Sequence, residues 1–271
     1  MKMITGGKWR RAAAWAVAAL AGGALSASAA YVIRLDGTKQ DGVDIRITPD
    51  GNVLLTTAPG QQTTFAPGQY QQAVADKPAE YDQAVQLYGS RKYDEAIALL
   101  GPVTTRLRGL FWDAYAGALI IQAQIAKGDN AGAVASADRL LAASPTLVAN
   151  PVMQDAQWQA LIAAKLFDRL EGQLAKELGG DSRPAAARAQ MARGDLRQAQ
   201  NRLEEAVMDY LRTALLYADV KDETEVQAEA LFKAATTLQR TKDLRSAQHC
   251  LKQLQERYPA SRAAARAGAK K

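Results

Sequence analysis

The chain has 271 residues, of which 48% are hydrophobic, 23% charged and 6% aromatic, and its formal net charge is +6. This composition excludes a wholly disordered chain, and the length allows one or two domains. A single cysteine excludes an intramolecular disulfide, and a single histidine excludes a His-rich metal site.

The basic surplus lies at the two ends of the chain. Residues 1–30 hold four basic side chains and residues 257–271 hold five, with no acid in either segment. Residues 31–256 carry 25 basic and 28 acidic side chains and are slightly acidic. Nucleic-acid binding needs basic charge on a folded face, so we expect no nucleic-acid partner.

The first 30 residues have the pattern of a secretory signal peptide. Basic residues precede an apolar run at 12–21, and small residues follow up to Ala30. Cleavage after Ala29 or after Ala30 fits equally well. The apolar run is too short to span a bilayer comfortably, although an uncleaved anchor is the alternative. No cysteine near the cleavage site could carry a lipid. We expect a periplasmic protein, or a secreted one if the host lacks an outer membrane, without a transmembrane segment in the mature chain.

Residues 31–70 predict a small module of three or four short antiparallel strands. Asp36-Gly37, the stretch 49–52 and the stretch 58–60 are turn sequences, and the segments between them alternate or run apolar. This spacing is similar to that of small SH3-like or Sm-like barrels. The aspartates of this module lack the spacing of a calcium loop and suit turns better.

From residue 78 onward, alanine-rich helical segments repeat. Short turn-and-helix motifs place a small or apolar key residue near the start of each second helix: Ala96, Ala133, Leu170, Ala199 and Ala247. The spacings of 37, 37, 29 and 48 residues lie around a helix–turn–helix period of about 34. The turn glycine supplies an unusual backbone conformation, the aspartate caps the next helix, and the alanine allows close helix packing. The last spacing predicts a long second helix around 197–218.

This pattern resembles the tetratricopeptide (TPR) repeat over residues 78–265. The resemblance implies a mainly α fold, an α-solenoid of about five helical hairpins, with a concave groove that binds protein partners. The large aromatic of the first-helix consensus is mostly absent, and an irregular helical bundle is the alternative.

The C-terminal segment resembles the last repeat of bacterial cell-envelope TPR proteins of the BamD and CpoB (YbgF) kinds. The resemblance rests on about 40 residues that end in Tyr258-Pro259-Ala260-Ser261. CpoB-type proteins begin with a coiled coil, where this chain has strands, and BamD is lipidated. The remaining residues, 266–271, predict a basic tail, and Ala263 onward a frayed helix end that could touch anionic lipid or cell wall.

We find no motif that carries chemistry. His249 and Cys250 are adjacent, which places them on different faces of a helix, and Cys250 has the pattern of a buried thiol. Phosphate loops, CxxC, HExxH and GxSxG motifs are absent from the sequence. We therefore predict no enzyme, no catalytic residue, no metal site and no cofactor.

The TPR resemblance also implies which residues would line the groove. Placed in the repeat register, these candidates are Tyr81, Tyr88, Tyr115, Gln122, Asp155, Gln159, Arg188, Gln239 and Arg240. Tyrosine provides contact area at low entropic cost, so the three tyrosines are the strongest candidates, with packing between repeats as the alternative for each. The predicted function is an envelope scaffold or adaptor. The alternatives are an outer-membrane assembly or cell-division factor, or a subunit of a cell-wall enzyme with a glycan-binding β module.

Overall fold

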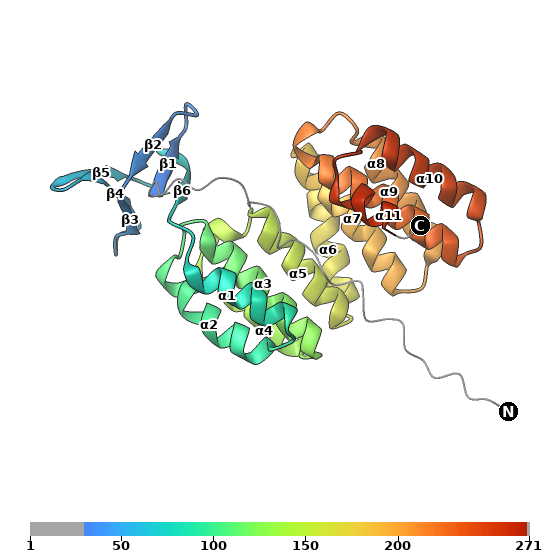
Figure 1. Ribbon diagram of the computed structural model, residues 1–271, viewed down its shortest axis with the longest axis horizontal. Helices are drawn as coiled ribbons and strands as arrows, with labels where there is room; N and C mark the ends of the chain where they lie inside the picture. The colour runs from blue at the N-terminus through green and yellow to red at the C-terminus, as the bar shows by residue number, and fades with distance from the viewer. Residues whose placement is uncertain (1–29, 270–271) are drawn as a thin grey trace. The chain divides into compact units, whose positions relative to one another are not determined.

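The computed structural model describes residues 30–269, so the predicted signal peptide lies outside the described residues except for Ala30 (Figure 1). The chain forms two compact units, unit 1 up to Ala160 and unit 2 from Leu161. The boundary falls inside helix α5 (Pro151–Ala163). Within the described part, no helix is long and apolar enough to cross a membrane.

Six short strands form the N-terminal module of unit 1. They are β1 (Ala30–Arg34), β2 (Lys39–Gly42), β3 (Asp44–Ile47), β4 (Val53–Ala58), β5 (Gln61–Phe65) and β6 (Tyr70–Val74). All neighbours are antiparallel, in the orders β2-β1-β6 and β3-β4-β5. An antiparallel β module is confirmed, with more strands than predicted. Strand β2 is polar throughout, and β6 is recognisable only through its pairing with β1.

The chain bends sharply where β2 leads into β3. Only Val43 separates the two strands, and its N–H donates to Thr56 O at 2.7 Å. A Cβ atom on Gly42 would lie 2.5 Å from Leu55 Cδ1 and 2.7 Å from Thr56 O, so only glycine fits at this corner. The bend brings both sheets around one core that includes Val32, Val53 and Leu55.

Helical hairpins make up the rest of the described chain. Their helices are α1 (Ala79–Gly89), α2 (Tyr93–Arg106), α3 (Trp112–Lys127), α4 (Asn130–Ala143), α5, α6 (Phe167–Leu178), α7 (Arg183–Ala199), α8 (Leu203–Leu216), α9 (Thr224–Arg240) and α10 (Leu244–Arg257). A shorter helix, α11 (Arg262–Gly268), follows. Contacts pair α1 with α2, α3 with α4, α7 with α8 and α9 with α10 as hairpins, and α5 leads into α6 through a turn of the same kind. The predicted fold class is confirmed.

The turn inside each hairpin uses a residue with positive φ at the same place. These residues are Arg91, Gly128, Lys165, Asn201 and Lys242, with spacings of 37, 37, 36 and 41 residues. Five positions after each turn residue lies a side chain with an exposed fraction of at most 1%: Ala96, Ala133, Leu170, Ala206 and Ala247. The repeat is therefore a property of the backbone as well as of the sequence.

The predicted fourth repeat start is wrong. The segment from Gly194 to Ala199 lies inside α7, and Ala199 is exposed rather than buried. The turn comes at Asn201, and Ala206 takes the buried position that was expected for Ala199. The predicted long helix at 197–218 is likewise two helices, α7 and α8. Gly194 serves close packing, because a Cβ atom there would lie 2.5 Å from the ring of Tyr210.

The Tyr-Pro-x-Ser sequence joins the last two helices. Tyr258 ends α10 and donates from its hydroxyl to Gln227 Oε1 at 3.0 Å, while Ser261 Oγ accepts from Ala264 N at 3.1 Å and caps α11. Ala263, Ala264 and Ala267 are buried, and α11 packs against α9. The expectation of a frayed end is therefore wrong for residues 263–268, and the end of the predicted tail, 270–271, lies outside the described residues.

The turn residues provide a first prediction. Lys165 is exposed and holds φ at 58°, a conformation that costs a side-chain-bearing residue about 1 kcal/mol relative to glycine. We expect Lys165→Gly to raise the free energy of unfolding by about 0.5–1 kcal/mol. Gly128→Ala, with φ at 90° and nothing within 4 Å of the added Cβ, should lower it by a similar amount. Urea unfolding of both variants measures this, and a destabilised Lys165→Gly would contradict the strain argument.

Candidate functional site

Four aromatic rings meet in unit 1. They come from α1, from the residue just before α3 and from the start of α3. Tyr81 lies on α1, Phe111 immediately precedes α3, and Trp112 and Tyr115 lie in the first turn of α3. The centroid of the Tyr81 ring is 5.2 Å from that of Trp112 and 6.3 Å from that of Tyr115, and Phe111 and Tyr115 are 4.8 Å apart. Tilted and edge-on contacts at these separations are favourable. The structure thus brings two predicted residues, Tyr81 and Tyr115, into one aromatic cluster.

The members of the aromatic cluster differ in exposure. Tyr81 is 5% exposed, and its burial raises the pKa of the phenol to about 12. Phe111, Trp112 and Tyr115 are half-buried. The ammonium group of Lys77 lies 5.6 Å from the Tyr81 ring centroid, within cation–π range. Tyr81 therefore packs the interior of the cluster, whereas the other three residues stay partly exposed.

Phe111 has a strained backbone. Its φ is 73°, a region that residues with large side chains rarely occupy. The strain places its ring against both Trp112, at 5.4 Å, and Tyr115. No repeat position marks Phe111 in the sequence, because it lies in the link before α3.

The other predicted residues of unit 1 do not belong to the aromatic cluster. Tyr88 is half-buried on α1 and pairs with Tyr93, with ring centroids 5.5 Å apart. Gln122 on α3 and Asp155 and Gln159 on α5 are half-buried. These side chains have the partial exposure that a contact surface needs, and their binding role stays a prediction.

Arg188 in unit 2 has a structural partner. Its guanidinium donates to Glu223, and the two side chains are 10% and 12% exposed. Burial raises the pKa of Glu223, and the charge of Arg188 opposes that rise. Gln239 and Arg240 are exposed at the end of α9, so they are accessible to a partner whereas Arg188 is largely covered.

A buried carboxylate on α8 organises several arginines. Asp209 is fully buried and accepts hydrogen bonds from Gln190 Nε2 at 2.6 Å and from Arg193 Nη2 at 2.9 Å. Arg197 Nε lies 3.0 Å and Arg212 Nη1 3.3 Å from the same carboxylate. One buried acid thus holds α7 and α8 together.

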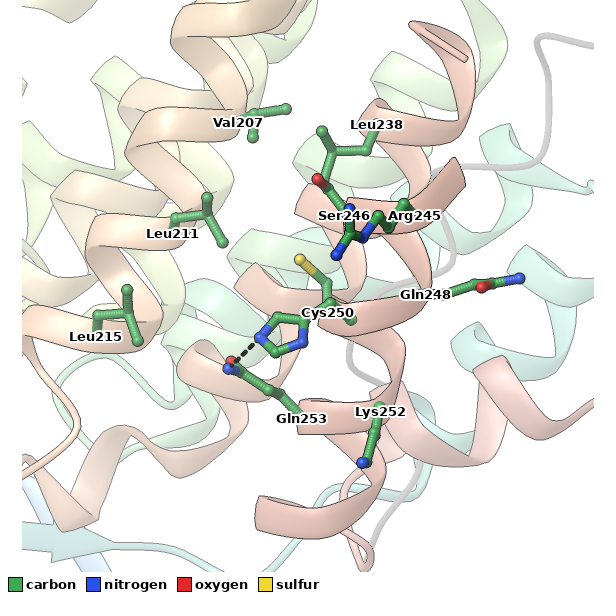
Figure 2. Close-up of a pocket in the computed structure, with 11 residues that line it drawn as sticks. Val207, Leu211, Leu215, Leu238, Arg245, Ser246, Gln248, Cys250, Lys252 and Gln253 are labelled. Carbon is green, nitrogen blue, oxygen red and sulfur yellow. Dashed lines mark hydrogen bonds between the residues drawn. The ribbon is translucent and has the colours of Figure 1, made fainter. Parts of the chain in front are cut away.

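A groove of about 760 Å³, with an apolar wall on α8, lies between α8 and α10 (Figure 2). Val207, Leu211 and Leu215 of α8 face across it toward Cys250 and its neighbours on α10 (Figure 2). No motif marks this groove in the sequence, although α8 carries a detectable signal. Its buried side chains at 206, 210 and 214 are followed by a second apolar series one residue further on.

Cys250 lies in the floor of this groove and is 4% exposed, as the sequence predicts. Burial raises the pKa of its thiol, which disfavours the reactive thiolate. His249 Nε2 lies 2.9 Å from Gln253 Nε2. Among residues 30–269, the structure contains no group of three or more acidic, histidine or cysteine side chains arranged to hold a metal ion.

Comparison with known proteins gives matches of structure alone. No protein-family model matches the sequence, and no curated protein matches it. A single-substitution variant of the nearly identical TPR-like repeats of a Podosopora anserina protein, described as a kinesin light chain, is similar with a TM-score of 0.44 and 18% identity. The unsubstituted repeats match with a TM-score of 0.43 and 19% identity. Each comparison covers 66% of this chain and 92% of the other.

Proposed function

We propose that the protein is an exported, non-catalytic scaffold of the cell envelope that binds protein partners through its helical hairpins. The observation that carries the proposal is the aromatic cluster of unit 1. Phe111, Trp112 and Tyr115 are held rigidly by ring contacts and remain half-buried. Rigid aromatic side chains of partial exposure are favoured contact residues in protein interfaces.

Export is supported by the signal-peptide pattern of the first 30 residues. Ala30 is 1% exposed and pairs with Gly42 in the sheet, so the folded module uses this residue. We therefore favour cleavage after Ala29. Export would place the mature protein in the periplasm, or outside the cell if the host lacks an outer membrane.

A narrower candidate is an outer-membrane assembly or cell-division factor similar to BamD or CpoB. It is favoured by the Tyr-Pro-x-Ser ending, in which Tyr258 and Ser261 both have defined hydrogen-bond partners. A cell-wall enzyme subunit whose β module binds glycan is the other alternative.

Crosslinking in intact envelopes, with mass spectrometry of the products, tests the scaffold proposal. We expect a discrete protein partner whose crosslinks concentrate beside the aromatic cluster, for example at Lys77. Tyr115→Ala should weaken the complex about 30-fold, as expected for a hot-spot residue worth about 2 kcal/mol. Tyr81→Phe keeps the buried ring and serves as the control that binds normally.

The contradicting result is equally definite. Retention of the protein on purified peptidoglycan, with no protein partner crosslinked, would favour the glycan-binding alternative. Equal partner binding by Tyr115→Ala and the wild type would remove the aromatic cluster from the proposal, provided that circular dichroism shows both to be folded.

A further inference from the structure

Helix α8 has more apolar surface than its packing in unit 2 requires. Ala206, Tyr210 and Ala214 are fully buried in the core that α8 shares with α9. The adjacent series Val207, Leu211 and Leu215 lines the groove toward α10, and Leu215 remains 55% exposed. Val207 is 8% exposed and Leu211 packs partly against the same core, so the second stripe is covered where α8 begins and open to solvent at Leu215, where apolar surface is left without a partner in unit 2.

The opposite wall of the groove is polar and basic. The residues that α10 contributes are Arg245, Ser246, Gln248, His249, Cys250, Lys252 and Gln253. The charged side chains of the lining, Arg245 and Lys252, are both basic, and the lining includes no carboxylate. Lys252 makes a long, exposed ion pair with Glu256 at 3.7 Å, which contributes little.

We propose that this groove binds an amphipathic helix of another protein, one with an apolar stripe and acidic residues beside it. The apolar series of α8 spans the nine residues from Val207 to Leu215, or about 12 Å, which matches two turns of a bound helix. Apolar side chains of the partner would pack on Val207, Leu211 and Leu215, and its acids would face Arg245 and Lys252.

The charge of the groove selects this occupant over a second copy of the chain. A symmetric dimer through the same surface would bring two sets of Arg245 and Lys252 toward each other, and like charges disfavour such an interface. An acidic helix instead complements the two cations. The groove lies on the second helices of the last two hairpins, so its test is independent of the aromatic cluster in unit 1.

Fluorescence anisotropy with a synthetic helix tests the proposal. The probe is a fluorescein-labelled 16-residue peptide with leucines at i, i+4, i+7 and i+11 and glutamates on both sides. We expect saturable binding to the full-length protein, and at least tenfold weaker binding to Leu215→Ser. Leu216→Ser is the matched control, because Leu216 is 61% exposed on the same helix but does not line the groove. Reversing the charge of both Arg245 and Lys252 to glutamate should also weaken binding at least tenfold.

Other outcomes overturn the proposal. It fails if the peptide does not bind, if the two serine variants bind equally, or if a peptide with lysines in place of the glutamates binds as tightly. A monomer–dimer equilibrium in sedimentation velocity that Leu215→Ser abolishes and Leu216→Ser preserves would assign the groove to a second copy. Circular dichroism spectra of all variants establish that each is folded.

Discussion

An Arg188→Ala variant should lose about 3 kcal/mol of unfolding free energy, because it leaves a buried carboxylate without its cation. Arg188 and Glu223 are both nearly covered and bonded to each other. Arg183→Ala is the control on the same helix, since the side chains of Arg183 and its partner Asp219 are 55% and 69% exposed. It should cost less than about 1 kcal/mol. Urea unfolding at pH 7 compares the two.

The pH dependence separates charge from packing in this variant. Burial raises the pKa of Glu223, and removing Arg188 takes away the charge that opposes the rise. An acid with a folded pKa above its unfolded value costs stability when ionised, and this cost disappears as the pH falls through the folded pKa. The deficit of Arg188→Ala should therefore shrink between neutral pH and about pH 4.3. A deficit that stays constant over this range would mean that Arg188 acts by packing alone.

The second large effect is expected at Gly194. A Cβ atom there would lie 2.5 and 2.6 Å from ring carbons of Tyr210, which is fully buried. The ring cannot move readily, because its hydroxyl donates to Asp195 Oδ1 at 2.7 Å, and Lys233 Nζ also bonds that carboxylate at 2.7 Å. We expect Gly194→Ala to destabilise the protein by about 1–3 kcal/mol despite the better helix propensity of alanine.

Gly172 provides the matched control for Gly194. It also lies within a helix, α6, but nothing is within 4 Å of an added Cβ atom. Gly172→Ala should stabilise by about 0.5–1 kcal/mol through helix propensity alone. Thermal unfolding should therefore shift the two variants in opposite directions, and a stabilised Gly194→Ala would show that Tyr210 can relocate.

The hairpin repeat could be predicted because its key residues are chemically alike and buried. Ala96, Ala133 and Ala247 are small enough for close helix packing, and each was identified in the correct place. Gly194-Asp195 has the composition of a turn, so the sequence pattern predicts the fourth repeat at the wrong place. The true turn uses Asn201, and only one of the five hairpin turns uses glycine. Tertiary packing, rather than local preference, decides which glycine packs against a neighbouring helix and which glycine ends a helix.

The candidate sites could be predicted only in part. Repeat register placed Tyr81 and Tyr115 on adjacent first helices, and the structure brings their rings together. Register does not determine exposure, so it could not separate buried Tyr81 from half-buried Tyr115. The groove between α8 and α10 depends on the separation of two helices that are not consecutive in the chain, which no periodicity in a single helix specifies.

The indole of Trp112 has a consequence for how unit 1 unfolds. It donates from Nε1 to Ala75 O at 3.0 Å, directly after β6, and it packs against both the core of the strands and the core of the first hairpin. Leu110 from the helical link is itself buried in the core of the strands. The six strands therefore cover apolar surface at the start of the helical repeats, as a capping repeat does in other repeat arrays. Folding of the strands and of the first hairpin should be cooperative, and a ligand bound to either would stabilise both.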